Sequence, residues 1–285
     1  MVDGVVFLDK PSGITSMEAV KIVRRLFHTK AGHTGTLDPI ASGLLIVLLG
    51  QATRFSEFFI ELDKVYLVDA LLGERTDTFD CEGKIIEKRE VNLNCEDIIS
   101  LLGSFIGEKL QKPPVFSAKK VAGERAYKLA RAGLHVDLKE SKVFIRRAEL
   151  IKCDLPLIQI LFEVSSGTYI RSLIDELGQA LGCGAHVVAL RRLEVGPFSL
   201  KEAVRPDELS QKDIQEPDRA LCFLPELSLS ADEARRVLSG AFLHLPDYHK
   251  SGFYRLYMEN LFIGVGYLEN KTLKPYRLLS DIKSG

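Results

Sequence analysis

The chain has 285 residues, of which 46% are hydrophobic, and its formal net charge is −1. This length and composition predict one large folded domain with a smaller one, and the absence of low-complexity tracts argues against disorder. The near-neutral charge argues against a uniformly cationic nucleic-acid binder. The start lacks the features of a signal peptide, and the apolar run ending at Leu49 is too short to cross a bilayer, so we expect a cytoplasmic protein without membrane association.

Cysteine and histidine usage gives no sign of a covalent or metal framework. The five cysteines are scattered and form no C-x-x-C pair, which predicts reduced thiols rather than a disulfide or zinc framework. The six histidines show no H-x-x-x-H pair, so we expect no metal site. The common ATP, dinucleotide and serine-hydrolase motifs are also absent, which disfavours those three classes of enzyme.

The first hundred residues predict strands around two capped helices. Residues 4–9 have the pattern of a short buried strand, and Thr15 with Glu18 forms a capping box for the next helix. Strands are predicted at 44–49 and 65–72, and a partner for the latter at 84–91 across a turn at 80–83. Asn94 is expected to cap a helix that continues to about residue 105.

The middle of the chain mixes helices and strands. Residues 111–142 start as a loop and are predicted to become helical over 124–132. Two strands are expected near 143–152 and 156–165, followed by a helix over 168–181. Because no regular βαβ alternation is present, the predicted fold class is α+β.

The last third shows a change of composition. Residues 201–229 are polar, acidic and rich in proline, which predicts a linker. Ser230 and Glu233 form a second capping box, and short strands are expected around 253–258, 261–267 and 277–279. We therefore predict a catalytic domain at 1–200 with an insertion at about 111–142, and a small β-rich domain at 230–285.

The charges are unevenly distributed along the chain. Residues 111–147 contain ten Lys or Arg and three acidic residues, whereas residues 61–100 contain eleven acidic residues and five basic ones. Such asymmetry predicts one side that faces a polyanion, and a solvated surface is the alternative interpretation.

One acidic residue lies in an unusual setting. Asp38 follows a Gly- and Thr-rich stretch and precedes Pro39, which biases its backbone towards an extended conformation. An acid presented in this way is either a nucleophile or a turn residue. Arg171 lies in the first turn of the predicted 168–181 helix, where the helix dipole disfavours a cation without an anionic partner. Asp38 is the obvious partner, and the pair would keep this acid ionised and fix its rotamer.

Several motifs together resemble the TruB family of tRNA pseudouridine synthases. They occur in the family's order over about residues 4–200, and the segment after 230 resembles a short PUA-type RNA-binding domain. The residues that carry the resemblance are D-K-P-S-G at 9–13, G-H-T-G-T-L-D-P at 32–39, K-V-Y at 64–66, G-E-R-T-D-T-F-D at 73–80, Q-K-P-P-V-F-S-A-K at 111–119, G-T-Y-I-R at 167–171, L-R-R at 190–192 and V-G-P-F at 195–198.

The resemblance implies a pseudouridine synthase fold, with a mixed and largely antiparallel central sheet flanked by helices. It also implies an isomerase that converts the T-loop uridine of tRNA, position 55, to pseudouridine by base flipping, without cofactor or metal. Asp38 would make the covalent bond with the target uridine, at the ribose C1′, by way of a glycal, or at uracil C6. Tyr66 would stack on the flipped uracil and accept the C5 proton, and Arg171 would hold Asp38.

The resemblance further implies a set of RNA contacts. His33 would fill the gap that the flipped bases leave, and the insertion would grip the T-arm. The expected RNA-binding residues are His33, Lys10, Lys64, Lys119, Lys120, Arg125, Tyr127, Arg131, Tyr169 and Arg191. We expect a monomer that needs no protein partner. The alternatives are a relative that depends on guide RNA, a non-catalytic RNA-binding or RNA-folding protein, and a generic α+β hydrolase, which lacks a second placed acid.

Overall fold

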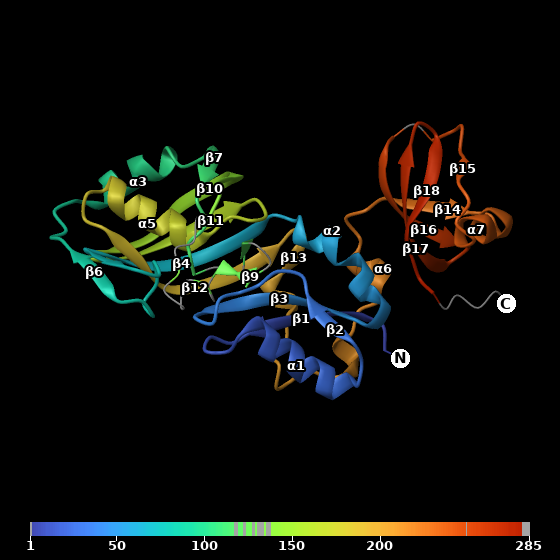
Figure 1. Cartoon of the computed structure of the whole chain (residues 1–285), viewed down its shortest axis with the longest axis horizontal. Coiled ribbons are helices and arrows are strands. Elements are labelled where there is room, and N and C mark those ends of the chain that lie inside the picture. Colours follow the sequence, from blue (N-terminus) through green and yellow to red (C-terminus); the bar gives the residue numbers. More distant parts are fainter. Residues whose placement is uncertain are drawn as a thin grey trace.

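The computed structural model shows an elongated molecule with a large and a small sheet (Figure 1). It describes residues 2–116, 119–121, 124–126, 129, 134, 138–248 and 250–280. The larger part carries the N-terminal two thirds of the chain, and the smaller part holds the C-terminal strands. Among the described residues, none of the helices has the length and apolar character that crossing a bilayer requires.

The large sheet is almost entirely antiparallel, which confirms the predicted α+β class. Among its described neighbours, only β12 and β3 run parallel, while β2 (Ala31–His33) and β13 (Phe198–Ser199) extend it at β3 and β12. The strand order is β1 (Gly4–Lys10), β3 (Ala41–Leu49), β12 (Ala185–Val195), β4 (Lys64–Leu72), β11 (Leu157–Val164), β10 (Ser141–Asp154) and β7 (Gly107–Gln111).

Three helices share a hydrophobic core with one face of this sheet. They are α1 (Ser16–Phe27), α3 (Cys95–Gly103) and α5 (Ile170–Ala180); α1 begins with the predicted capping box, and the predicted cap Asn94 begins α3. Ala19 and Val23 of α1 pack in the same core as Leu173 of α5 and Tyr66 of β4. The helices α1 and α5 therefore lie on the same face of the sheet, α1 over β1 and β3 and α5 beside β12 and β4.

The opposite face of β1 and β3 packs against a second core that includes the C-terminal domain. Phe7 and Leu44 share this core with Phe55 of η1 (Gly50–Phe55), with α2 (Ser56–Ile60) and with α6 (Pro217–Ala220), and Phe262 of the C-terminal sheet joins it. Aromatic contacts across the junction include Phe58 with Phe253, whose ring centroids are 5.0 Å apart. Because apolar burial stabilises this junction, the small domain is packed against the large one.

The C-terminal sheet has the order β14 (Glu226–Leu229), β16 (Gly252–Met258), β17 (Leu261–Glu269), β18 (Thr272–Leu278) and β15 (Leu243–His244), with α7 (Ala231–Leu238) against it. The predicted linker segment contains short ordered elements, namely η2 (Leu200–Glu202), η3 (Gln211–Asp213) and α6. Its last residues form β14, the first strand of the small sheet.

Three local predictions were wrong. Strand β6 (Ile85–Lys88) pairs with β5 (Glu74–Thr76) rather than with β4, which lies between β11 and β12. Strand β12 was not predicted, because its arginines break the apolar pattern and find their partners only in the folded protein. Glu124 and Arg125 form β9, paired with β8 (Lys120–Val121), where the start of a helix was expected.

The predicted absence of a disulfide was also wrong. Cys95 at the start of α3 and Cys153 near the end of β10 are bonded; they are 58 positions apart in sequence and their Cα atoms are 6.2 Å apart. The packing of α3 on β10 brings the two thiols together, and nothing in their spacing along the chain reveals this. Cys81, Cys183 and Cys222 are free thiols.

Removal of this disulfide is expected to destabilise the large domain. For a loop of this length, the loss of unfolded-state entropy corresponds to about 4 kcal/mol in the free energy of unfolding. Denaturant unfolding of the oxidised protein and of Cys95→Ser with Cys153→Ser would measure the difference. The matched control is Cys81→Ser with Cys222→Ser, which removes two exposed free thiols and should leave the transition in place. Equal midpoints for all three proteins would contradict the prediction.

Candidate active site

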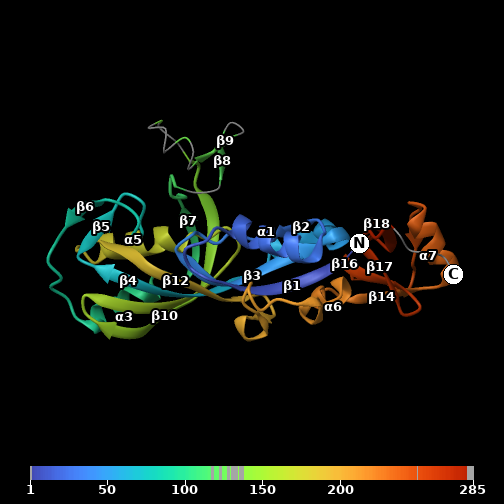
Figure 2. The same cartoon turned by 90° about the horizontal axis from the view of Figure 1, so that it is seen from below.

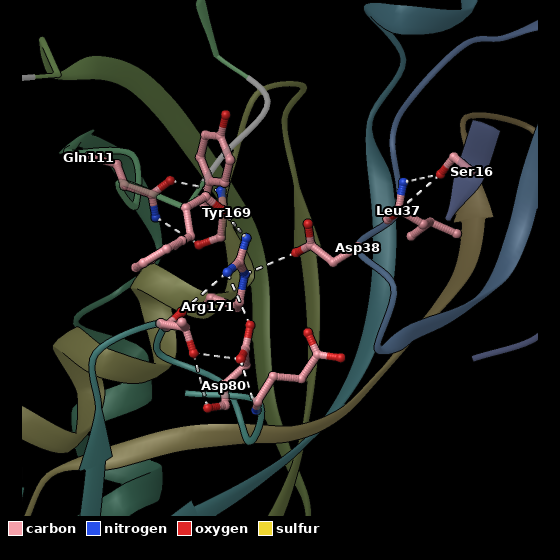
Figure 3. A network of polar contacts seen from close by, with 10 residues as sticks. Ser16, Leu37, Asp38, Asp80, Gln111, Tyr169 and Arg171 are labelled. Atoms are coloured by element: carbon pink, nitrogen blue, oxygen red, sulfur yellow. Dashed lines mark hydrogen bonds and ion pairs between the residues drawn. The ribbon is translucent and has the colours of Figure 1, made fainter. Parts of the chain in front are cut away.

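The acidic turn between β2 and β3 is held by polar contacts from two directions. Leu37 donates its amide to Ser16 Oγ over 2.8 Å, and the same hydroxyl donates to the Leu37 carbonyl over 3.0 Å (Figure 3). From the other side, Arg192 donates to the carbonyl oxygen of Gly35 over 3.1 Å. These contacts fix the residues on both sides of Thr36 and leave Asp38 at the rim, where its side chain is 35% exposed.

A pocket of about 480 Å³ opens beside Asp38. This volume is within the range of small-molecule and nucleoside-sized sites. Its walls come from the acidic turn, from strands β4 and β12, from the start of α5 and from the insertion. The lining residues used below are Asp38, Lys64, Tyr66, Lys119, Tyr169, Arg171 and Arg192.

Arg171 also lines the pocket, and the whole residue is only 4% exposed. The predicted ion pair is present: Arg171 Nε lies 2.9 Å from Asp38 Oδ2. Nη1 lies 3.0 Å from Asp80 Oδ2 and donates to the Thr78 carbonyl over 3.2 Å, and Nη2 donates to the Phe116 carbonyl over 2.9 Å (Figure 3). A buried guanidinium with partners on every side has a fixed orientation, so it can aim the carboxylate of Asp38.

Asp80 is the functional candidate that the sequence did not reveal. Its residue is 4% exposed, and Oδ1 accepts from Thr78 Oγ1 over 2.6 Å and from the Glu82 amide over 3.1 Å. These donors orient the carboxylate so that its second oxygen faces Arg171. The motif at 73–80 was noticed for its resemblance, but nothing in its spacing connects it to residues 90 positions away.

The surroundings of Asp38 raise the pKa of its carboxyl. Burial raises the pKa of this carboxyl and is the largest effect, Arg171 lowers it, and the nearby Asp80 carboxylate raises it again. The net pKa lies above the ordinary value of an aspartate. The positive charge of Arg171 therefore offsets part of the cost of burying the Asp38 carboxylate. The Asp80 carboxylate interacts with the same guanidinium.

Tyr66 lies on β4, is 9% exposed and lines the pocket. Its cross-strand neighbours are Phe162 on β11 and Arg192 on β12. Alternation along β4 directs Tyr66 to the face that carries α5, which is the face of the pocket. Of the three predicted catalytic residues, all line one pocket, and Asp38 and Arg171 are in direct contact.

Two of the four lysines expected to bind RNA, Lys10 and Lys64, are buried. Lys10 is 0% exposed, and its ammonium donates to the carbonyl oxygens of Pro11 and Ile14 over 2.9 and 2.6 Å. In this conformation Lys10 holds the turn that follows β1, and its contact with RNA stays a prediction. Lys64 lines the pocket and donates to two carbonyl oxygens just before β4, each at 2.5 Å. Burial lowers the pKa of each lysine to about 8.

Arg191 lies on the face of the sheet opposite the pocket, and the RNA contact expected of it stays a prediction. It donates to Asp9 Oδ2 over 2.7 Å and to Ser42 Oγ over 3.1 Å. Leu190 and Arg192, one residue to either side, line the pocket, and successive strand residues point to opposite faces. Arg192 is the arginine at the site; it is 2% exposed and holds the acidic turn.

The root of the insertion is tied to the start of α5. The Gln111 side chain donates to the Tyr169 carbonyl over 3.1 Å and accepts from the Tyr169 amide over 2.8 Å. Tyr169, which is expected to bind RNA, lines the pocket. Lys119 also lines it, with its ammonium 3.3 Å from the Lys139 carbonyl.

The remaining RNA-binding candidates are only partly described. His33 ends β2 opposite Val47 and is half-buried next to the pocket residue Thr34. Lys120 and Arg125 pair through their backbones in the β8–β9 hairpin. Tyr127 and Arg131 lie outside the described residues.

The fold is that of a pseudouridine synthase. A chain from a structure of an H/ACA RNP bound to a substrate RNA containing 2′-deoxyuridine superposes with a TM-score of 0.73 at 25% identity, over 97% of this chain and 85% of that one. A chain of the Cbf5–Nop10–Gar1 complex gives a TM-score of 0.70 at 27% identity, over 93% and 78%.

The chain belongs to the TruB family of pseudouridylate synthases. The family's N-terminal domain model matches residues 24–170, a tRNA pseudouridylate synthase B C-terminal domain model matches 171–227, and a TruB C-terminal model of pseudouridine synthase II matches 225–279. The tRNA pseudouridine synthase B of Aquifex aeolicus is 44% identical, over 97% of this chain and 99% of the relative. That of Haemophilus influenzae strain PittEE is 41% identical, over 98% and 96%.

The Asp80→Asn variant tests whether Asp80 positions the site. Arg171 loses a charged anchor, and a misplacement of about 1 Å can cost roughly 100-fold in rate, so we expect kcat to fall by about 10- to 100-fold. Because the Asp80 charge raises the pKa of Asp38, its removal should also move the acid limb of the pH–rate profile to lower pH.

The matched control is Asp77→Asn, which changes an exposed carboxylate of the same turn that accepts from the Lys84 amide. Its rate and pH profile should stay close to those of the wild type. A fall in kcat without movement of the acid limb would indicate a purely structural role for Asp80.

Proposed function

We propose that this protein isomerises uridine to pseudouridine in tRNA. The observation that carries the proposal is the single pocket lined by Asp38, which is paired with Arg171, and by Tyr66. The relatives named tRNA pseudouridine synthase B match nearly the whole chain, which supports tRNA as the substrate. By the same resemblance, the target is the T-loop uridine at position 55.

The chemistry requires one bond to break and one to form. The N1–C1′ bond of the uridine breaks, the uracil turns, and a C5–C1′ bond forms while the C5 proton is lost and N1 gains a proton. These changes balance without a redox partner or an added group. A single positioned carboxylate fits covalent catalysis rather than the paired-carboxylate hydrolysis of glycosidases.

We assign Asp38 as the group that attacks the target nucleotide, in its ionised form. Arg171 keeps it aimed and partly offsets the burial that raises its pKa. Tyr66 is proposed to stack on the uracil and to accept the C5 proton, because its ring lines the same pocket. The attack is proposed at C1′, through a glycal, or at C6, and the three routes share these residues.

Access to the uridine requires base flipping, because a stacked base cannot enter a pocket of this kind. His33, next to the pocket, is proposed to fill the space that the base leaves. Lys64, Lys119 and Tyr169 line the pocket and are proposed to contact the flipped nucleotide and its neighbours. The insertion at about 111–142, which includes Lys120, Arg125, Tyr127 and Arg131, is proposed to grip the T-arm backbone.

The domain boundaries proposed above follow the same scheme, with 1–200 catalytic, 201–229 connecting and 230–285 a PUA-like RNA-binding domain. We propose that the protein works alone and as a monomer in the cytoplasm. A guide-dependent enzyme is the second candidate, favoured by the fold similarity to a chain of an H/ACA RNP. The match to the Aquifex aeolicus relative, at 44% rather than 25% identity and over 99% rather than 85% of the matched protein, favours the stand-alone enzyme.

The Asp38→Asn variant tests the proposed nucleophile. Tritium release from tRNA that carries the label at uridine C5 should fall by at least about 10⁴-fold, as for loss of other covalent nucleophiles. Binding of tRNA should stay within a few-fold, because Asp38 is a minor part of a large polar interface. A tRNA with cytidine at position 55 is the control for specificity. Turnover by the variant at the wild-type rate would refute the assignment.

The Lys119→Ala variant with Lys120→Ala tests the insertion. Each phosphate contact that is lost should reduce the slope of log affinity against log salt by about one, so the pair should reduce it by about two. Filter-binding measurements at several salt concentrations give this slope. The control is Lys84→Ala, which removes an exposed cation in the β5–β6 turn. An unchanged slope in the double variant would remove these lysines from the interface.

A further inference from the structure

Helix α1 and the turn after it carry cations that take no part in the proposed active site. Between Glu18 and Asp38 the chain contains Lys21, Arg24, Arg25 and Lys30 and no acidic residue. Arg24 is used internally, because its guanidinium donates to the Ala31 carbonyl through Nε over 3.0 Å. The other three cations are exposed, and within the described part of the chain none of them forms an ion pair.

Several other surface cations of the protein have a carboxylate partner. Arg146, Arg147 and Lys152, for example, are each paired with a carboxylate within 2.5 Å of their own nitrogen atoms. Pairing lowers the attraction of a surface for polyanions, whereas unpaired cations retain it. The exposed side of α1 is therefore electropositive in a protein whose net charge is −1.

The cations lie in a row along α1 that leads away from the pocket. Lys21 and Arg25 are four residues apart on one side of the helix, and the exposed Ile22 and Leu26 form a parallel pair beside them. Ser16, the first residue of α1, is bonded to Leu37 next to the catalytic candidate. At 1.5 Å per residue, Lys21 lies about 7.5 Å and Arg25 about 13.5 Å along the helix from Ser16.

The row continues towards the C-terminal domain. The Lys30 carbonyl accepts from the amide of Gly50, the first residue of η1, over 2.7 Å. In the same turn Arg54 donates to the Leu278 carbonyl at the end of β18, and Gln51 accepts from the Ser280 amide over 2.6 Å. The surface of α1 thus connects the pocket to the small domain.

This surface faces the same side as the insertion. Figure 2 shows α1 and β2 on the side of the large sheet from which β8 and β9 project, while α6 lies on the opposite side. An RNA loop that enters the pocket from this side brings its helical stem with it. The stem must then lie either against the insertion alone or along α1.

We infer that α1 binds the helical stem of the substrate RNA, with Lys21, Arg25 and Lys30 on consecutive backbone phosphates. Ile22 and Leu26 pack against riboses at the edge of the wide, shallow minor groove of the stem. The inference rests on the proposed function for the identity of the RNA. It adds a second phosphate-binding surface, which holds the stem between the pocket and the C-terminal domain.

The test compares two double variants in the full-length protein. Lys21→Ala with Arg25→Ala removes two cations of the row, and alanine maintains the helix. Lys201→Ala with Lys212→Ala removes two exposed cations in η2 and η3 and is the matched control. The RNA is the unmodified T-arm hairpin with its full stem, and thermal melts verify that both variants fold.

The first variant should raise the Kd of the hairpin by roughly five- to thirty-fold, since each screened ion pair contributes up to about five-fold. The slope of log affinity against log salt should fall by about two, and the loss of activity should appear in KM. The control variant should match the wild type in all three measurements. A wild-type Kd and slope for Lys21→Ala with Arg25→Ala would overturn the inference.

A second RNA separates the stem from the loop. A hairpin with the same loop and only two base pairs lacks the distal phosphates, so the α1 variant and the wild type should bind it equally. A defect that persists with the short hairpin would place these cations at the loop and overturn the assignment to the stem. Failure of the proposed function is distinguishable, because it would abolish tritium release from the wild type while leaving the binding comparison intact.

Discussion

The site depends on one buried guanidinium shared by two carboxylates. Arg171 could not be buried without anionic partners, because an unpaired buried charge destabilises a protein by several kcal/mol, about 3–5 when a partner is lost. Its partners Asp38 and Asp80 come from two separate turns, and the Phe116 carbonyl comes from the root of the insertion. The same interaction that makes burial tolerable therefore connects three segments that must meet around the nucleotide.

Local signals in the sequence predicted much of the fold, and long-range pairing accounts for the errors. The capping boxes at Thr15, Asn94 and Ser230 are present, because a cap needs only residues three positions apart. The central strand β12 was missed because Arg192 occupies a core-facing position and is satisfied by the carbonyl oxygens of Leu44 and Gly35. The Cys95–Cys153 bond was missed for the same reason, since its partners are distant in sequence.

The candidate site was predicted where chemistry constrains a residue locally. Asp38 before a proline and Arg171 at a helix start are both unusual, and the two residues do pair. The RNA contacts were harder to predict, because a charge in the sequence does not show whether it is exposed. Lys10 proved to be fully buried, and Arg191 points to the face opposite the pocket although its neighbour Arg192 lines it.

The cations of this protein fall into two groups, those buried around the pocket and those exposed on the surface. Lys10, Lys64, Arg171 and Arg192 are buried around the pocket, where they bind carbonyl oxygens or carboxylates and fix the backbone. Groups held in this way need not reorganise when charge develops, which is the basis of electrostatic preorganisation. Lys64 also lines the pocket, where it is proposed to contact the flipped nucleotide, whereas Lys21 and Arg25, proposed to bind the RNA stem, are exposed. The net charge of the chain therefore does not indicate where RNA binds, whereas the separate positions of the buried and the exposed cations do.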